Sequence, residues 1–159
     1  MTTEDAATIQ DASADVWKLS GSDLLVLANR AGTVAALRTS SAGLEPGTAQ
    51  KLLRQTLDQG ESRDWWFDGR HLYEVWVQPI YFGAPSQNTT IGLLGLGYEV
   101  DEGAAKDFSK IAASEVMFNY GSTPVASTLS AAQQGELSRQ TKELAKNSSG
   151  EAQEIQIGL

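Results

Sequence analysis

One stretch of the sequence constrains the fold more than any other: WWFDGRHLYEVWVQPIYFGAPSQNTTIGLLGLGYEV, residues 65–100. It contains three of the four tryptophans, three of the four tyrosines and the single histidine. Strand-like patterns on either side of a polar connection predict a hairpin of two long strands, 70–82 and 90–100. Because aromatic side chains bury the largest areas, we expect the core, and any ligand site, to form around this hairpin.

Large side chains alternate along the first strand of this hairpin. One face presents His71, Tyr73, Val75, Val77, Pro79 and Tyr81, and the other presents Arg70, Leu72, Glu74, Trp76, Gln78 and Ile80. Since both faces carry bulky residues, we expect both to be covered by other elements.

The segments before the hairpin read as a helix, a smaller hairpin and a second helix. Residues 3–19 carry apolar residues at helical spacing; these are Ile9, Ala12, Val16 and Leu19. Two short apolar runs, 23–28 and 33–37, flank a turn in which Gly32 supplies a positive φ. Pro46 then begins a helix that Gly60 ends.

The segments after the hairpin are more polar. We expect a helix over 101–113 with Ala104, Phe108 and Ile111 inward, a short hairpin over 115–128 and a polar helix over 129–146. Residues 152–159 alternate like a strand. A strand that begins so near the last residue suggests that the sequence stops within a longer protein.

Hairpins, rather than crossover units, dominate this order of elements. That order predicts an α+β fold, with an antiparallel sheet and helices on its faces. We divide the chain into a core at 1–112, including the first helix, and an extension of hairpin, helix and strand at 113–159. The extension reads as a truncated second subdomain.

Composition excludes several kinds of function. The net charge of −8 argues against a nucleic-acid surface, because phosphate contacts need clustered Lys and Arg. The absence of cysteine rules out disulfides and thiolate metal sites, and a single histidine rules out a multi-histidine site. We therefore expect no metal and no cofactor. The sequence shows no signal-peptide pattern and no apolar run long enough to span a bilayer.

Three segments resemble a known family. DLLVLANRAGTVAAL is similar to the opening hairpin of extracytoplasmic PAS-like sensor domains, the Cache group. HLYEVWVQPIYFG with IGLLGLGYEVDEGAAKDFSKIAASEVMF resembles the two closing strands and the following helix. EVMFNYGSTPVASTL looks like the hairpin that follows the sheet in sensors placed before cyclase, kinase or chemotaxis modules.

This resemblance implies a PAS-like five-stranded antiparallel sheet with flanking helices and a ligand cavity between the sheet and its connecting segments. It also implies membrane tethering in the full protein, through spans that this sequence lacks. The paired Tyr and Asp positions of amino-acid-sensing members are not seen, so the resemblance does not name a ligand.

Few residues here suggest catalysis. His71 is the one candidate base, and the serines lack a nucleophile-elbow context, so we expect no enzyme. The run Gly92–Gly97 lies within a strand and lacks the dinucleotide spacing; its glycines are better explained by close backbone approach. Glu74 lies mid-strand, where either an exposed edge position or a pocket role fits.

The aromatic residues of the long hairpin have two interpretations. They form an aromatic-walled cavity with polar anchors, or they are core. If a cavity forms, we expect it to bind its ligand through Trp66, Arg70, Tyr73, Trp76, Gln78 and Tyr98.

Two functions follow from these patterns. The first is a small-molecule-sensing extracytoplasmic (periplasmic) domain of a membrane-bound bacterial signal transducer, of the histidine kinase, cyclase or chemoreceptor type. The alternative is a ligand-free dimerisation or protein-interaction module of a receptor, with the contact made by helix 129–146 or the first helix. A homodimer is compatible with both.

Overall fold

The computed structural model describes residues 3–83 and 89–147, and describes side chains within 9–83 and 89–140. Seven strands and four helices lie in these ranges. They are α1 (Thr3–Ser20), β1 (Leu24–Asn29), β2 (Val34–Thr39), α2 (Pro46–Asp58), β3 (Arg63–Phe67), β4 (Leu72–Tyr81), β5 (Thr90–Glu99), α3 (Glu102–Ala112), β6 (Met117–Tyr120), β7 (Thr123–Ser127) and α4 (Ala131–Asn147). The strand predicted at 152–159 lies outside the described residues.

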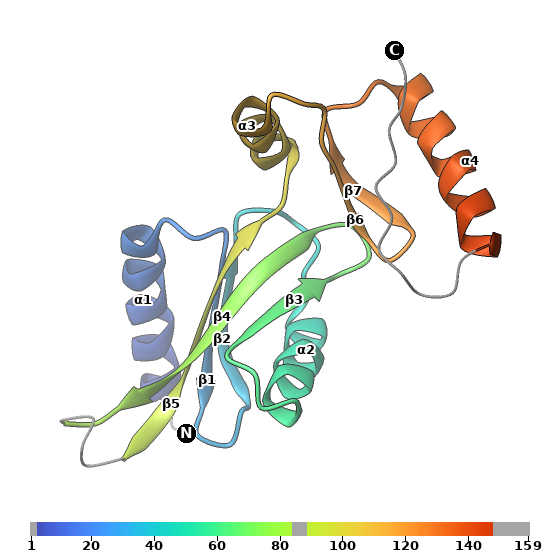
Figure 1. The fold of residues 1–159 in the computed structure, drawn as a ribbon. Coiled ribbons are helices and arrows are strands. Elements are labelled where there is room, and N and C mark those ends of the chain that lie inside the picture. Colours follow the sequence, from blue (N-terminus) through green and yellow to red (C-terminus); the bar gives the residue numbers. More distant parts are fainter. Residues whose placement is uncertain (1–2, 84–88, 148–159) are drawn as a thin grey trace.

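Five strands form one antiparallel sheet in the order β2-β1-β5-β4-β3 (Figure 1). The β1–β2 and β4–β5 hairpins lie side by side because β1 also pairs with β5, bringing Leu24 opposite Gly97. Gly32 has a φ of +76° in the first hairpin turn, as predicted. The α+β fold with a five-stranded antiparallel sheet is therefore confirmed.

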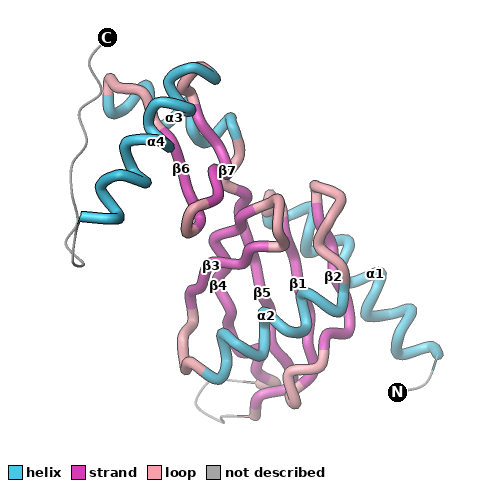
Figure 2. The backbone as a smooth tube through the Cα atoms, turned by 90° about the vertical axis from the view of Figure 1, so that its right-hand side faces the viewer, coloured by secondary structure: helices cyan, strands magenta, loops and turns pink. Residues whose placement is uncertain are grey.

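Helices cover the two faces of this sheet unequally. Figures 1 and 2 show α1 on one face and α2 on the other. α1 packs against β1 and β2, whereas α2 packs against β2 and β3. The main core lies between the sheet and α2. It contains Leu24, Val26, Ala28, Leu44, Ala49, Leu53, Trp66, Tyr73, Val75 and Val77.

Glycines in β5 let this core close tightly. A Cβ at Gly97 would lie 3.0 Å from the Leu24 side chain and 3.1 Å from that of Val75. A Cβ at Gly92 would lie 2.6 Å from the backbone oxygen of Ala28. The prediction that these glycines serve close approach, rather than nucleotide binding, agrees with these distances.

The apolar spacing of α1 does not mark its buried side, and the inward face predicted for α3 is wrong. Leu19 of α1 is 88% exposed, and Ser13 is the buried residue of its central turns. Arg38 of β2 holds that turn, because its Nε donates to the Ser13 hydroxyl over 3.2 Å and its Nη2 to the Gln10 carbonyl over 2.9 Å. A small residue thus lets α1 approach the sheet, which a bulky apolar stripe would prevent.

In α3, too, a small residue is buried where large apolar residues were expected. Ile111 is 84% exposed, Phe108 is also exposed, and Ala105 is the buried residue. The N-terminus of α3 is capped by Asp101, which accepts a hydrogen bond from the Ala104 N–H over 2.8 Å.

The elements after β5 lie beyond one end of the sheet (Figures 1 and 2). β6 and β7 form a separate two-stranded sheet, and α3 packs against β7. Two ring pairs hold this part: Phe108 against Phe118 at 5.5 Å, and Tyr120 against Phe67 of β3 at 4.9 Å between centroids. The division into units at 1–112 and 113–159 stays a prediction.

Candidate functional site

The six residues predicted to bind a ligand do not lie together. Trp66 and Tyr73 point into the core on the α2 face of the sheet. Trp76, Gln78 and Tyr98 occupy the opposite face, as the strand alternation and the pairing of Gln78 with Leu94 require. Arg70 lies between β3 and β4 and is exposed. Their role in ligand binding remains a prediction, but one pocket cannot contain all six side chains.

Trp66 is a core residue with a fixed polar partner. It is 0% exposed, and its indole Nε1 donates to the Thr56 hydroxyl over 2.9 Å. That hydroxyl in turn donates to Asp64 over 2.7 Å. Because the indole N–H is already bonded to Thr56, the Trp66 side chain offers a ligand no free hydrogen bond.

Tyr73 differs from Trp66 in its hydrogen bonding. Its side chain is 0% exposed, and its hydroxyl has no hydrogen-bond partner among the described residues. Burial raises the pKa of Tyr73 to about 12, helped by the negative charges of Glu99, Asp68 and Asp23. The nearby Ser41 hydroxyl opposes this rise as a hydrogen-bonding group, but it donates to Glu99 and does not meet the Tyr73 hydroxyl in hydrogen-bond geometry. Tyr73 is therefore a protonated donor at neutral pH, and an unpaired buried hydroxyl of this kind needs an explanation.

Carboxylates surround this hydroxyl at one end of the sheet. Glu99 pairs directly across from Tyr73 in the β4–β5 ladder. Its carboxylate accepts the Ser41 hydroxyl over 2.5 Å, and its N–H donates to Asp23 over 2.9 Å. We call Asp23, Ser41, Asp68, His71, Tyr73 and Glu99 the polar cluster.

Asp68 organises the turn between β3 and β4. Its carboxylate accepts the N–H groups of Arg70 and His71, over 2.8 and 2.7 Å, and lies 3.0 Å from the Nδ1 atom of His71. Burial alone would raise the pKa of Asp68, but the backbone and ring hydrogen bonds of His71 and the Arg70 N–H outweigh it. The pKa of this carboxyl is therefore lowered below 3.8.

The segment between β2 and α2, residues 40–44, covers the polar cluster. Gly43 has a φ of +149°, and a Cβ there would lie 3.0 Å from an Asp68 oxygen and 3.1 Å from the His71 ring. Leu44 is buried in the core beside it. A molecule could reach the Tyr73 hydroxyl from this side only if the 40–44 segment moved.

The opposite face of β4 presents a half-open aromatic surface. The Trp76 and Tyr98 rings meet edge to face at 5.9 Å, and Tyr98 is 45% exposed. The Arg63 guanidinium lies 5.5 Å from the Trp76 ring and pairs with Glu74. The expectation that both faces of this strand are covered is thus wrong here, because α1 packs on β1 and β2 instead. Glu74 is a partly exposed ion-pair residue with Arg63 as the partner that sequence reasoning missed.

Sequence reasoning also missed most of the polar cluster. Ser41, Asp23 and Glu99 come from three separate segments, and no motif links them. The sequence patterns assigned Arg70 and His71 to the strand 70–82 and gave Asp68 no role in a site. A signal was present there, because an Asp followed by Gly and His can bond its own backbone and the ring two and three residues on.

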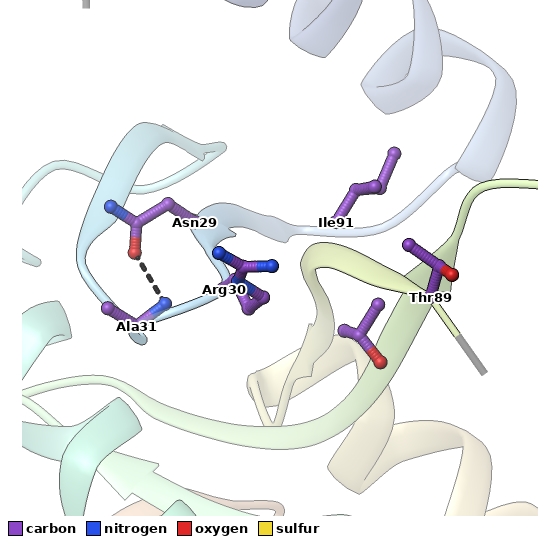
Figure 3. A pocket seen from close by; sticks show the side chains of 6 residues that line it. Asn29, Arg30, Ala31, Thr89 and Ile91 are labelled. Carbon is purple, nitrogen blue, oxygen red and sulfur yellow. Dashed lines mark hydrogen bonds between the residues drawn. The ribbon is translucent and has the colours of Figure 1, made fainter.

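A surface pocket lies at the other end of the sheet (Figure 3). Its volume is about 400 Å³, and its lining combines the β1–β2 turn with the beginning of β5. The lining residues are Asn29, Arg30, Ala31, Thr89, Thr90 and Ile91. None of the six predicted ligand-binding residues lines this pocket.

Three further observations on the described residues bear on function. Among them, no three His, Asp or Glu side chains are placed to hold a metal ion. His71 pairs with Asp68, but no serine or threonine hydroxyl in the described ranges hydrogen-bonds its other ring nitrogen. Within the same ranges, no helix combines the length and the apolar character that crossing a membrane requires.

Comparisons with known proteins identify the fold. No known family model matches the sequence, and no curated protein matches it. The crystal structure of the periplasmic domain of Vibrio cholerae LuxQ superimposes with a TM-score of 0.57 at 14% identity. The match covers 79% of this chain and 61% of the LuxQ domain, so the chain spans less than two thirds of that domain. The fold of this chain is the PAS-like α+β fold of that periplasmic domain.

Proposed function

We propose that this chain is a small-molecule-sensing extracytoplasmic domain of a membrane-bound bacterial signal transducer, of the Cache type. The ligand binds between the sheet and the 40–44 segment, where the Tyr73 hydroxyl donates a hydrogen bond to it. The output is of the kinase, cyclase or chemoreceptor type, and the membrane anchor belongs to the rest of the protein.

The unpaired Tyr73 hydroxyl is the observation that carries this proposal. A buried donor without a partner costs about 1–3 kcal/mol, and such strain is typical of functional sites. Glu99 and Asp23 lie on the same side and accept hydrogen bonds. The ligand class that fits is a small polar molecule with an acceptor for Tyr73 and a donor, such as an amine or hydroxyl, for a carboxylate.

Signal transfer follows from the chain path. Asp101, two residues after Glu99, caps the N-terminus of α3, and Phe67 next to Asp68 contacts Tyr120 of the β6–β7 hairpin. A ligand that moves the 40–44 segment and repositions Glu99 or Asp68 thereby shifts α3 and the hairpin. This is a population shift, which requires that the ligand bind one arrangement better than the other.

The test is a thermal-shift screen with amino acids, other amines, polyols and carboxylates on three proteins: the wild type, Tyr73→Phe and Tyr98→Phe. A compound at a hundred times its Kd should stabilise the wild type by about 2.7 kcal/mol. Tyr73→Phe should lose this shift while remaining at least as stable as the wild type without ligand. Tyr98→Phe removes the corresponding hydroxyl on the exposed face of the sheet and should retain the ligand-induced shift.

Other outcomes decide against the proposal. Loss of the shift in Tyr98→Phe, with retention in Tyr73→Phe, would move the site to the Trp76 face. Silence across the screen, together with a concentration-dependent dimer in sedimentation, would favour the alternative of a ligand-free interaction module. The exposed surface around Trp76 and Tyr98 supports this alternative, because aromatic residues are enriched at protein interfaces.

A further inference from the structure

Every polar side chain that lines the pocket at the β1–β2 turn can donate a hydrogen bond. Asn29 Oδ1 accepts two backbone N–H groups, from Ala31 over 2.9 Å and from Thr33 over 3.0 Å. These bonds fix the orientation of the carboxamide and leave its Nδ2 hydrogens as its remaining polar capacity. The lining contains neither Asp nor Glu.

Arg30 is the one charged residue of this lining. Its guanidinium has neither an ion pair nor a hydrogen bond among residues 3–83 and 89–147. In Figure 3 it lies between the turn that carries Asn29 and Ala31 and the strand that carries Thr89 and Ile91. Among the described residues, therefore, Arg30 is an unpaired cation in a pocket lining without carboxylates, although the chain has a net charge of −8.

The turn that presents these groups is rigid. Asn29 N–H donates to the Thr33 carbonyl and Gly32 N–H to the Asn29 carbonyl, each over 2.9 Å. Gly32 is buried with a φ of +76°. Asn29 is therefore held before any ligand arrives, which reduces the ordering cost of binding.

The remaining wall is apolar and hydroxylic. Ile91 is half exposed, Ala31 lies opposite on the turn, and Thr90 adds a hydroxyl. The volume of about 400 Å³ falls in the range of roughly 300–1,000 Å³ that is usual for small-ligand pockets. Donors on one side and methyl groups on the other fit an anion that carries a short hydrocarbon part.

We propose that this pocket binds a small organic monocarboxylate, with the carboxylate on Arg30 and Asn29 and its hydrocarbon part on Ile91. The arginine fork matches a carboxylate in a bidentate manner. A single arginine balances a single negative charge, whereas a phosphate group would bring excess charge into an already acidic protein. The site is distinct from the polar cluster, because its lining includes Thr90 and Ile91 at the start of β5, whereas Tyr73 pairs with Glu99 at the end of β5.

The experiment is an amide-resolved NMR titration of the full 159-residue chain at constant ionic strength. The probes are sodium butyrate, sodium acetate, sodium phosphate and neutral butyramide. Butyrate should shift the amide signals of Ala31, Thr90 and Ile91, and should bind more tightly than acetate and phosphate. Butyramide should produce no saturable shift.

Variants separate the two parts of the site. Arg30→Gln should raise the butyrate Kd at least tenfold, and Arg30→Lys should raise it less, because charge remains without the fork. Ile91→Ala should bind acetate as before but lose the preference for butyrate. Arg54→Gln on the exposed face of α2 is the matched control and should leave every Kd unchanged.

The proposal is overturned if Arg30→Gln binds butyrate like the wild type, if Arg54→Gln weakens binding equally, or if phosphate binds more tightly than butyrate. The fold of Arg30→Gln is checked by comparing its amide spectrum with that of the wild type. If the two spectra do not superimpose, Ile91→Ala provides the second test of the proposal. Tyr73→Phe should not alter the butyrate Kd, so failure here is distinguishable from failure of the proposed sensing site.

Discussion

The two faces of strand β4 carry similar residues, but one face is buried and the other is partly exposed to solvent. On the α2 face, Tyr73 and Val75 are fully buried beneath a helix and the 40–44 segment. On the other face, Trp76 and its neighbour Tyr98 remain partly open, because α1 covers β1 and β2 instead. Aromatic content therefore does not decide which face is sealed. The positions of α2 and the 40–44 segment decide it, while β5 brings Glu99 to Tyr73 and the neighbouring segments bring Asp23 and Asp68.

The strongest test of this difference uses the adjacent tryptophans of β3. Trp66→Ala should lower the free energy of unfolding by about 3–5 kcal/mol, since it opens a large cavity in the sealed face. Trp65 is 43% exposed on the other face, so Trp65→Ala should lower the free energy of unfolding far less. Urea denaturation of both variants measures the two values. Equal losses would mean that the faces are sealed alike.

A second test concerns the buried carboxylate of the polar cluster. Asp68→Asn should destabilise by about 1–3 kcal/mol, because it removes the charge that accepts three hydrogen bonds. The pKa of Asp68 is lowered in the folded state, so the unfolded state binds more protons near pH 3.8. Its contribution is therefore complete above pH 3.8 and is lost as the pH falls through the folded pKa.

Urea denaturation of wild type and Asp68→Asn at a series of pH values checks this sign. The stability difference between the two proteins should be constant just below neutral pH and should shrink in acid. A difference that grows as the pH falls would contradict the lowered pKa.

Close packing of the sealed face can be tested with glycine. Gly97→Ala should destabilise by about 1–3 kcal/mol, because the added methyl overpacks against Leu24 and Val75. Gly135 of α4 has open space around it, so Gly135→Ala should instead stabilise by up to about 1 kcal/mol through helix propensity. Thermal unfolding of both variants should give shifts of opposite sign.

The smallest effect is expected on the open face. Glu74→Gln breaks the ion pair with Arg63, whose side chain is 59% exposed. Exposed pairs contribute about 0–1 kcal/mol, so the loss should stay within that range and should shrink further in high salt. A loss comparable to that of Asp68→Asn would show that this face is screened from water by a partner.

Sequence patterns predicted the sheet well, because alternation and turn residues act locally. The hairpins around Gly32 and Gly121 and the helix that begins at Pro46 all formed as expected. The residues that α1 and α3 bury were not predicted, since Ser13 and Ala105 are buried for their small size and not for hydrophobicity. Periodicity of large apolar residues carries no information about such contacts.

The candidate site was predicted only in part. Tyr73 was recognised, but its surroundings depend on a ladder register that sets Glu99 opposite it and on a loop that carries Ser41 over it. These groups are distant in the sequence and share no motif. Trp76, Gln78 and Tyr98 were grouped with Tyr73 because strand alternation alone does not tell which side a connecting segment will cover.

The pairing of β1 with β5 has a consequence for synthesis. β1 contains the apolar run Leu24–Ala28, and one of its two edges can be satisfied only when β5 has been made. Until then the β1–β2 hairpin leaves an open strand edge of the kind that templates aggregation. Such distant pairing is also slow to form. The first half of the nascent chain therefore cannot complete its sheet, and folding of the core waits for translation to pass Glu99.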